Sequence, residues 1–239
     1  YVVWDVMEEF IDNYRNIYAQ SITSTGSTFW GGAGVYVSRS VYDQVNPIVR
    51  VINDQIIICW GDQRNSSNSI YYQILDTGGY SELGSNGRQL FWSNANSPNI
   101  ENVRTFPHPD GIAVVWTALK DIVNGYGIYY QYINPGGVKL LEQYGRTVTE
   151  GAYTYAIDYS AAISPEGKLC FVWRDNDNRI RLQVIDENGC RQMGDYGIIV
   201  TTSTGIYQRK PKVTYQDGAF YIGWEQGMDV LTSVGMRTL

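Results

Sequence analysis

Short apolar runs that end in tryptophan recur along the chain at a nearly constant interval. The tryptophans are Trp4, Trp60, Trp116, Trp173 and Trp224. Their spacings are 56, 56, 57 and 51 residues. Self-similarity at a fixed period of this length is typical of repeat proteins.

A second apolar run follows each of the first four tryptophans and contains a glutamine. The glutamines are Gln20, Gln73, Gln131 and Gln183. A glycine stands 14 residues after every one of them, at Gly34, Gly87, Gly145 and Gly197. In contrast, the distance from tryptophan to glutamine varies as 16, 13, 15 and 10 residues. Length variation is therefore concentrated in one loop, where binding residues are often found.

Each repeat predicts four short strands: one before a turn, one that ends at the tryptophan, one that ends near the glutamine and one after the glycine. The turns before the tryptophans have hairpin chemistry. They are Asn53-Asp54, Pro109-Asp110-Gly111, Pro165-Glu166-Gly167 and Gln216-Asp217-Gly218. Residues 70–75 are apolar on both faces except for Gln73, whose buried amide would need hydrogen-bond partners. This pattern predicts an all-β fold, a β-propeller of four-stranded antiparallel blades.

One propeller domain is expected over residues 1–239, with blades at about 1–45, 46–100, 101–155, 156–208 and 209–239. The first blade lacks its inner strand and the last its outer strand, which predicts about 4.5 blades of a larger ring of about 6–8 blades. A closed five-bladed ring with two short blades is the alternative. A β-solenoid fits less well, because its coils repeat over fewer residues. The residues Met7, Phe10, Ile11, Tyr14 and Ile17 have helical spacing and predict a helical turn in the first long loop, with the strand resuming by Ile17.

The amino-acid composition limits the classes of partner that the protein can bind. The chain has 20 Tyr, 7 Trp and 25 Gly, and its net charge of −6 disfavours nucleic acid and anionic membranes. Uninterrupted apolar stretches are too short for membrane insertion. Cys59, Cys170 and Cys190 form an odd set without CxxC spacing, so they are interpreted as structural thiols, and neither a disulfide framework nor a zinc site is indicated.

One repeat shows the pattern most fully, in Cys59-Trp60-Gly61-Asp62-Gln63-Arg64 followed by Ile70-Tyr71-Tyr72-Gln73-Ile74-Leu75-Asp76. It resembles repeats in large secreted bacterial proteins, often exported by the type nine secretion route, with propellers related in shape to sialidases. The resemblance implies a scaffold and an extracellular or cell-surface location, but no activity. The third copy departs from the pattern with Trp116-Thr117-Ala118, which has neither the acid nor the arginine.

A weaker similarity is to fungal fucose-binding lectin propellers, which carry an arginine before the glutamine strand and a glutamate after it. Only Arg179 stands at the arginine position, four residues before Gln183. Glu82 and Glu142 do not follow their glutamines at equal distances. The lectin pocket is therefore not carried over.

Four carboxylates follow the repeated tryptophans and are the candidates for glycosidase chemistry, which needs converging acids. They are Asp5, Asp62, Asp175 and Glu225. Because they recur at near-equivalent positions, the favoured interpretation is that they cap turns or pair with Arg64 and similar groups. Sialidase chemistry would also need an arginine trio, a tyrosine nucleophile and Ser-x-Asp-x-Gly-x-Thr-Trp turns, and that motif does not occur.

The remaining candidate residues have structural explanations that do not require a ligand or a catalytic role. The segment from Asp175 to Asp186 resembles a calcium loop, but Ile180 occupies the place of its glycine. His108 is the single histidine and is interpreted as a turn residue, which excludes His-based triads and multi-His metal sites. Trp30 and Trp92 could stack on sugars or cover the blade rim.

The sequence therefore predicts a non-catalytic extracellular interaction or adhesion scaffold that binds a protein or glycan partner through its loops. No catalytic, cofactor or metal residues are assigned, no cofactor is expected, and the repeated tryptophans and glutamines are structural positions. The partner is expected to be an unidentified protein or glycan, with the rest of a longer chain or an assembly. The alternative is a glycan-processing enzyme of sialidase or glycosidase type, or a carbohydrate-binding lectin.

Overall fold

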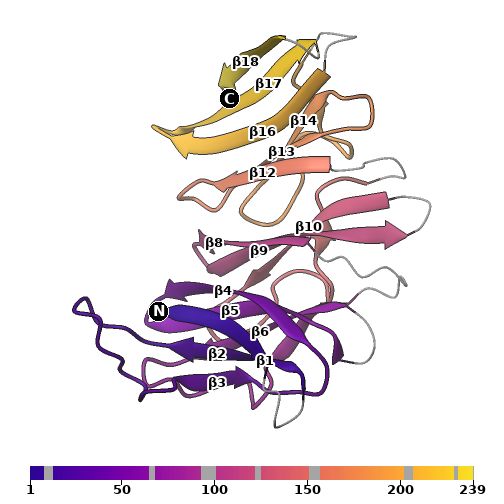
Figure 1. Cartoon of the computed structure of the whole chain (residues 1–239). Helices are drawn as coiled ribbons and strands as arrows, with labels where there is room; N and C mark the ends of the chain where they lie inside the picture. The colour runs from indigo at the N-terminus through magenta and orange to yellow at the C-terminus, as the bar shows by residue number, and fades with distance from the viewer. Residues whose placement is uncertain are drawn as a thin grey trace. The chain divides into compact units, whose positions relative to one another are not determined.

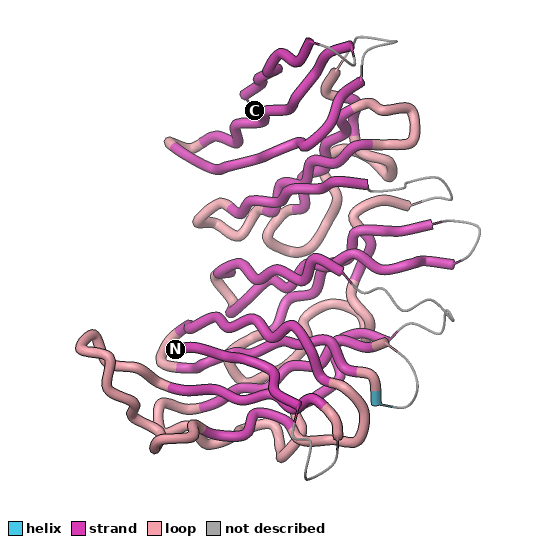
Figure 2. The backbone as a smooth tube through the Cα atoms, viewed as in Figure 1, coloured by secondary structure: helices cyan, strands magenta, loops and turns pink. Residues whose placement is uncertain are grey.

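A computed structural model describes residues 1–7, 13–64, 68–92, 101–121, 125–150, 157–201, 207–228 and 231–238 (Figure 1). These residues form strands joined by turns and loops, and no α-helix occurs among them; the short cyan segment in Figure 2 is a single residue in 3₁₀ conformation. The helical turn predicted near Phe10 and Ile11 lies outside the described residues.

The described residues form eighteen strands in chain order. They are β1 (Val2–Met7), β2 (Arg15–Gln20), β3 (Val35–Ser38), β4 (Gln44–Ile52), β5 (Gln55–Asp62), β6 (Ser69–Leu75), β7 (Arg88–Trp92), β8 (Glu101–His108), β9 (Gly111–Asp121), β10 (Gly125–Ile133), β11 (Arg146–Thr147), β12 (Ile157–Ile163), β13 (Leu169–Arg174), β14 (Ile180–Ile185), β15 (Ile198–Ile199), β16 (Tyr207–Gln216), β17 (Ala219–Met228) and β18 (Leu231–Thr238).

The strands form five sheets in which neighbours in sequence are neighbours in space. The first and fifth sheets have the orders β1-β2-β3 and β16-β17-β18. The second, third and fourth are four-stranded, with the orders β4-β5-β6-β7, β8-β9-β10-β11 and β12-β13-β14-β15. The strands pair as antiparallel hairpins. Four-stranded antiparallel meanders are propeller blades, which confirms the predicted all-β propeller class.

The chain divides into two compact units. The first contains Tyr1–Trp116 and Gln131–Gly145, and the second contains Thr117–Tyr130 and Arg146–Leu239. The first and second sheets lie within the first unit, and the fourth and fifth lie within the second. The strands of the third sheet contribute residues to both units.

The tight hairpins follow from the turn residues. Asn53 and Asp54 connect β4 to β5 with φ angles of 48° and 62°. Asp217 and Gly218 connect β16 to β17 with φ angles of 50° and 82°. Two consecutive positive φ angles define the two-residue type I′ turn, whose twist matches that of the flanking strands.

The sheets pack through faces of two kinds, and we call the one that carries the repeated tryptophan the Trp face. In the first unit, Ile17 and Ala19 from the opposite face of the first sheet share a core with Trp60 of the second. In the second unit, Val172 from the opposite face of the fourth sheet shares a core with Ile222, beside Trp224 of the fifth.

The junctions of the third sheet follow the same rule. In the first unit, the rings of Phe91 and Trp116 lie 5.2 Å apart. In the second unit, those of Tyr130 and Phe171 lie 6.1 Å apart. In each case a Trp face packs on the opposite face of the preceding sheet.

Burial separates the cysteines into two groups. Cys59 and Cys170 are buried in strands, and burial raises the pKa of each thiol to about 12. Cys190 is exposed. Because thiolates are the reactive form, we expect iodoacetamide at about pH 8 to alkylate one thiol per native chain and three after unfolding. Mass spectrometry of the intact protein would count the adducts, and rapid native labelling of Cys59 would contradict the buried assignment.

Candidate functional site

The repeated glutamines hold the loop between the third and fourth strands of each blade. Gln73 is fully buried, and its Nε2 donates to the carbonyl oxygen of Gly84 at 2.6 Å. Its Oε1 accepts from the backbone amides of Ile74 at 2.9 Å and Leu83 at 3.0 Å. Gln20, Gln131 and Gln183 make the same donation to a carbonyl 11 residues later, at 2.6, 2.7 and 2.6 Å. These side chains serve the backbone and are not available to a ligand.

The repeated glycines explain the constant interval of 14 residues. Gly87 has a φ of 67°, and a Cβ there would fall on the Tyr72 carbonyl oxygen and lie 2.7 Å from Cη2 of Trp60. Gly197 lies in the same way over Leu182 and Trp173. Trp60, Trp116 and Trp173 are fully buried. Tryptophan, glutamine and glycine thus fix one loop together.

The carboxylates that follow the tryptophans are held by cations. Asp62 is 2% exposed, and its Oδ1 accepts from Nε of Arg64 at 2.7 Å. Its Oδ2 accepts from Arg64 at 2.6 Å and from Nε1 of Trp60 at 2.9 Å. The Arg64 guanidinium also lies 4.0 Å from the ring centre of Tyr71, which completes a compact acid, guanidinium and aromatic cluster.

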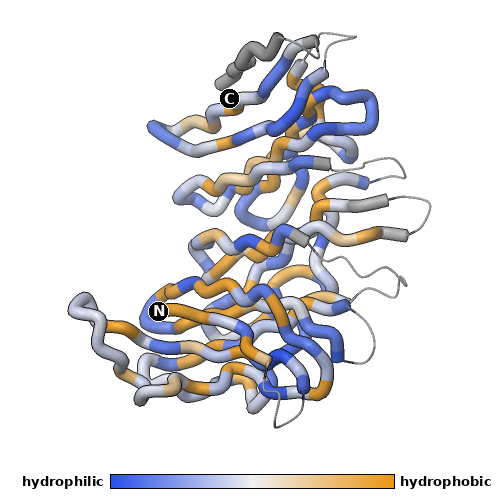
Figure 3. Tube along the Cα trace, in the orientation of Figure 1, coloured by the Kyte–Doolittle hydropathy of each residue, from blue (hydrophilic) through white to orange (hydrophobic). Residues whose placement is uncertain are grey.

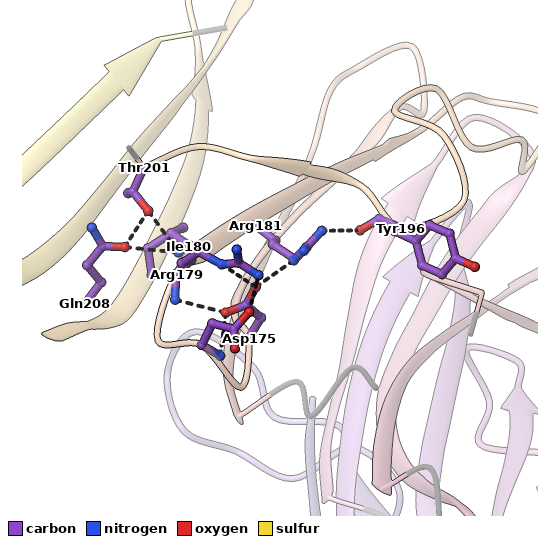
Figure 4. Close-up of polar contacts among 8 residues, drawn as sticks. Asp175, Arg179, Ile180, Arg181, Tyr196, Thr201 and Gln208 are labelled. Carbon is purple, nitrogen blue, oxygen red and sulfur yellow. Dashed lines mark hydrogen bonds and ion pairs between the residues drawn. The ribbon is translucent and has the colours of Figure 1, made fainter. Parts of the chain in front are cut away.

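Asp175 forms a second cluster of an acid and guanidinium groups, shown in Figure 4. Its Oδ2 accepts from Nε of Arg181 at 2.7 Å and from Arg179 at 3.0 Å. Burial by itself would raise the pKa of Asp175, but hydrogen bonds from the Arg179 backbone amide and from the guanidinium groups of Arg181 and Arg179 outweigh it and hold the pKa below its usual value. Asp175 therefore remains an anion at neutral pH.

The outer two carboxylates are paired more openly. Asp5 lies 3.1 Å from Arg15. Glu225 lies 3.1 Å from Lys210 and 3.2 Å from Arg209. The hydrogen bond from Lys210 is the largest cause that lowers the pKa of Glu225. The structure thus pairs all four carboxylates with basic groups, as the interpretation from the sequence favoured.

In two blades an arginine links the carboxylate to the start of the fourth strand, but the two arginines come from different positions in the repeat. Arg64, in the loop after β5, donates to the carbonyl oxygen of Asn86 at 3.3 Å. Arg181, within β14, donates to that of Tyr196 at 3.3 Å. Asn86 and Tyr196 both precede a repeated glycine, so each guanidinium joins a carboxylate to the start of the fourth strand.

A feature that the sequence analysis missed lies beside these pairs. The first strands of four blades contain a residue with positive φ: Asn46 at 55°, Asn102 at 56°, Asp158 at 48° and Lys210 at 50°. Three of these strands show a register shift at that residue, beside the repeated tryptophan of the partner strand. All four residues are exposed. Bulges of this kind re-aim side chains and are common next to active sites.

We call the end of a tryptophan strand, with its carboxylate pair and the neighbouring bulge, the Trp corner. The loop of variable length begins at the same corner, because it follows the carboxylate along the chain. The dipeptides Asn46-Pro47 and Lys210-Pro211 were the signal for two bulges, since proline in a strand marks an edge or a bulge. Asn102 and Asp158 have no such signal.

The other candidates lie in or beside the sheets, two of them buried and two exposed. Trp30 is 8% exposed and belongs to the core of the first unit, with Nε1 donating to the Thr77 carbonyl at 3.0 Å. Trp92 ends β7 and is 39% exposed. His108 ends β8, is buried and stacks on Tyr132 at 4.2 Å. Glu82 accepts a hydrogen bond from Gln55 at 3.2 Å.

The segment that resembles a calcium loop is a turn closed by its own groups. Oδ1 of Asp175 accepts from the backbone amides of Asp177 and Arg179 at 3.0 Å each. Within the described part of the chain, no group of three or more His, Cys, Asp or Glu residues could hold a metal ion. The same residues contain no helix long and apolar enough to cross a membrane.

No family model and no curated protein matches the chain. Solved structures do match it. An endo-arabinanase of Bacillus licheniformis, named as GH43, is 15% identical with a TM-score of 0.39, over 81% of this chain and 70% of its own. The Trypanosoma rangeli sialidase is 12% identical with a TM-score of 0.46, over 93% of this chain and 38% of its own. An α-L-arabinofuranosidase of Fusarium graminearum is 12% identical with a TM-score of 0.44, over 94% and 67%.

These neighbours are named as enzymes that act on glycans. That finding contradicts the non-catalytic interaction scaffold predicted from the sequence and agrees better with its alternative, a glycan-processing propeller. The prediction from the sequence failed because the candidate acids recur at near-equivalent positions and were therefore interpreted as structural. The chain spans little more than a third of the length of the sialidase.

Proposed function

We propose that this chain belongs to a glycan-processing propeller protein and that its Trp corners contact the glycan. The observation that carries the proposal is the exposed polar bulge residue that recurs beside a carboxylate and a guanidinium group. Sugar hydroxyls both donate and accept hydrogen bonds, so they are matched by carboxylates, guanidinium groups and amides side by side. The bulges place Asn46, Asp158 and Lys210 at such positions.

The side chains of the described Trp corners are better suited to recognising a glycan than to transferring a proton to it. A general acid for glycoside cleavage needs a raised pKa so that it carries a proton at neutral pH. The pKa values of Asp175 and Glu225 are lowered instead, by hydrogen bonds from basic groups. We therefore assign these carboxylates to orienting their arginine and lysine partners, which would meet the sugar.

Asp158 is the exposed carboxylate among the bulge residues, and its side chain lies 3.6 Å from Arg174. We expect Asp158→Asn to weaken glycan binding or turnover by about 10- to 100-fold, the usual size of a lost hydrogen bond to a charged group. Asparagine tolerates the left-handed backbone at this position, so the bulge should persist. Binding and sugar release would be measured with arabinan, xylo-oligosaccharides and sialyllactose.

The matched control is Asp217→Asn, which changes an exposed aspartate with positive φ at the tip of the hairpin between β16 and β17. That hairpin lies at the opposite end of β16 from its bulge, and the variant should bind and act like the wild type. The proposal fails if none of the three glycans is bound or cleaved. An equal loss in both variants would place the contact away from the Trp corners.

We also propose an extracellular or cell-surface location, in keeping with the repeat resemblance to exported bacterial proteins and with glycans as substrates. Detection of the native protein by antibody on intact cells, or in the culture medium, tests this. Detection in the cytoplasmic fraction alone would contradict it.

A further inference from the structure

Tyr42 has a backbone conformation that large side chains rarely adopt. It lies in the connection between β3 and β4, with a φ of 73°. The other described non-glycine residues with a positive φ are asparagine, aspartate or lysine. The left-handed region costs free energy for a residue with a side chain, and a bulky residue there is an outlier. Tyr42 is nevertheless 42% exposed, so the strain is not offset by full burial of the ring.

Hydrogen bonds within this turn and from two other segments hold it in place. The backbone oxygen of Asp43 accepts from the amide of Gln63 at 3.0 Å, and its Oδ1 accepts from the amide of Arg15 at 2.9 Å. Gln44 is fully buried, and its Nε2 donates to the Ser40 carbonyl oxygen at 3.1 Å, which closes the turn. Strained backbone persists only where the surroundings fix it, and it is concentrated at functional sites. The turn is therefore a candidate binding element.

Polar groups of the first and second sheets meet beside the turn. The strand β1 is mostly orange in Figure 3, and Asp5 is its single charged residue. Oδ2 of Asp5 accepts from Nη1 of Arg15 at 3.1 Å, and Oδ1 accepts from the backbone amide of Asn46 at 3.3 Å. Asn46 is the exposed bulge residue of β4, and the side chain of Arg15 is 46% exposed. A carboxylate, a guanidinium group and a side-chain amide are thus close together at the surface.

The aromatic ring and these polar groups belong to one surface. The rings of Tyr14 and Tyr42 lie 5.5 Å apart with an interplanar angle of 43°. Tyr14 precedes Arg15, whose backbone amide bonds to the residue after Tyr42. Asn46 follows Tyr42 by four residues. All of these residues lie within the first compact unit. We call Asp5, Tyr14, Arg15, Tyr42 and Asn46 the tyrosine subsite.

The chemistry of the tyrosine subsite suits a sugar without a charge. Ligand sites combine aromatic side chains with a few polar groups that fix the orientation of the ligand. A sugar ring has C–H faces that can stack on tyrosine, and its hydroxyl groups donate to carboxylates and accept from guanidinium and amide groups. Asp5 pairs with the positive charge of Arg15, and Asp43 adds a second acid. With a chain charge of −6, a sugar that carries a carboxylate would be repelled.

We propose that the tyrosine subsite binds a neutral sugar unit of the glycan, with the ring of Tyr42 against one face of the sugar and the polar side chains of the subsite at its hydroxyl groups. This inference rests on the proposed function and narrows its substrate class, because arabinose and xylose units are neutral whereas sialic acid is anionic. It also gives the strained turn a role, since the turn places an aromatic ring where a ligand can reach it.

Tyr42→Asn tests the proposal, because it removes the ring while asparagine tolerates a positive φ. We expect calorimetric titration with arabinan and xylo-oligosaccharides to show that the neutral glycan bound by the wild type binds the variant about tenfold more weakly, the usual size of a lost aromatic contact. The melting temperature should change by less than about 4 °C, because relief of backbone strain offsets the lost ring contacts. Sialyllactose should bind the wild type at least about tenfold more weakly than that neutral glycan.

The matched control is Tyr80→Asn, which changes a tyrosine that is 76% exposed in the loop between β6 and β7. This loop begins at the end of β6 away from the Trp corner of the second sheet, whereas the turn of Tyr42 leads into β4 at that corner. The control should bind glycans as the wild type does. Circular dichroism would establish that each variant is folded. If Tyr42→Asn does not fold, Tyr42→Gly replaces it, because glycine adopts a positive φ without strain.

The outcomes separate this inference from the proposed function. A wild type that binds none of the three glycans overturns both. Binding that is weakened by Asp158→Asn but not by a folded Tyr42 variant overturns the tyrosine subsite and leaves the proposed function standing. Equal losses in Tyr42→Asn and Tyr80→Asn also overturn the subsite, because the effect would not be specific to its ring. A wild type that binds sialyllactose best overturns the neutral substrate class.

Discussion

Gly87→Ala is expected to destabilise the protein by about 3 kcal/mol. A Cβ at this position would overlap the Tyr72 carbonyl oxygen and lie 2.7 Å from Cη2 of Trp60, and neither group can move because both belong to paired strands. Overpacking in a dense core costs about 1–3 kcal/mol, and a positive φ adds about 1–2 kcal/mol for a residue with a side chain. Urea unfolding followed by tryptophan fluorescence would measure the loss, which corresponds to a lower melting temperature by about 6–12 °C.

Gly84→Ala is the matched control, because Gly84 has a φ of 87° in the same loop and open space at its Cβ position. It carries the backbone strain without the collision, so its cost should be about 1–2 kcal/mol. The difference between the two variants measures the close approach of glycine and tryptophan. Equal losses would show that the backbone angle alone selects glycine at position 87.

The repeat that fixes this loop was visible in the sequence because each of its parts needs one residue type. Only glycine fits over the tryptophan with a positive φ, and glutamine supplies a donor and an acceptor at the right reach for the loop backbone. Both requirements act on the same loop, so the interval of 14 residues does not vary. The strand count and the all-β propeller class followed from that constancy.

The Trp corners were harder to predict, because their geometry does not depend on a single residue type. The bulge is occupied by Asn46, Asn102, Asp158 or Lys210, residues that share a backbone angle and no side-chain chemistry. The arginine that reaches the fourth strand comes from the loop in one blade and from a strand in another. A position that accepts several residue types leaves no repeated letter. The pairing of acids with arginines could be predicted, but the exposed groups beside them could not.

The same reasoning explains why the function was misjudged. Carboxylates that recur at equivalent positions were interpreted as structural, and the ion pairs of Asp62 and Asp175 agree with that role. A structural role for the acids does not prevent ligand binding, because a paired cation can remain partly exposed. Side-chain exposure at Arg179 is 31%, so part of its guanidinium remains open to a ligand while Asp175 holds it.

Gln73→Met is expected to cost about 3 kcal/mol and to release the loop after β6. Methionine has a similar volume, but it leaves the amides of Ile74 and Leu83 and the carbonyl of Gly84 without the bonds that Gln73 makes. Each unsatisfied buried group costs about 1–3 kcal/mol, and water reaching the exposed Gly84 reduces the total. Urea unfolding would measure the loss, and hydrogen exchange should show the Leu83 amide losing protection.

Gln89→Met is the control for that substitution, because Gln89 is half-buried in the adjacent strand β7 and its side chain donates one long hydrogen bond, to Ser69 at 3.4 Å. Its cost should stay below about 1 kcal/mol, as for a bond with poor geometry. The comparison separates the loss of an amide from the loss of a loop anchor. If the two variants unfold at the same urea concentration and the Leu83 amide stays protected in both, the glutamine does not hold the loop, and tryptophan with glycine must fix it alone.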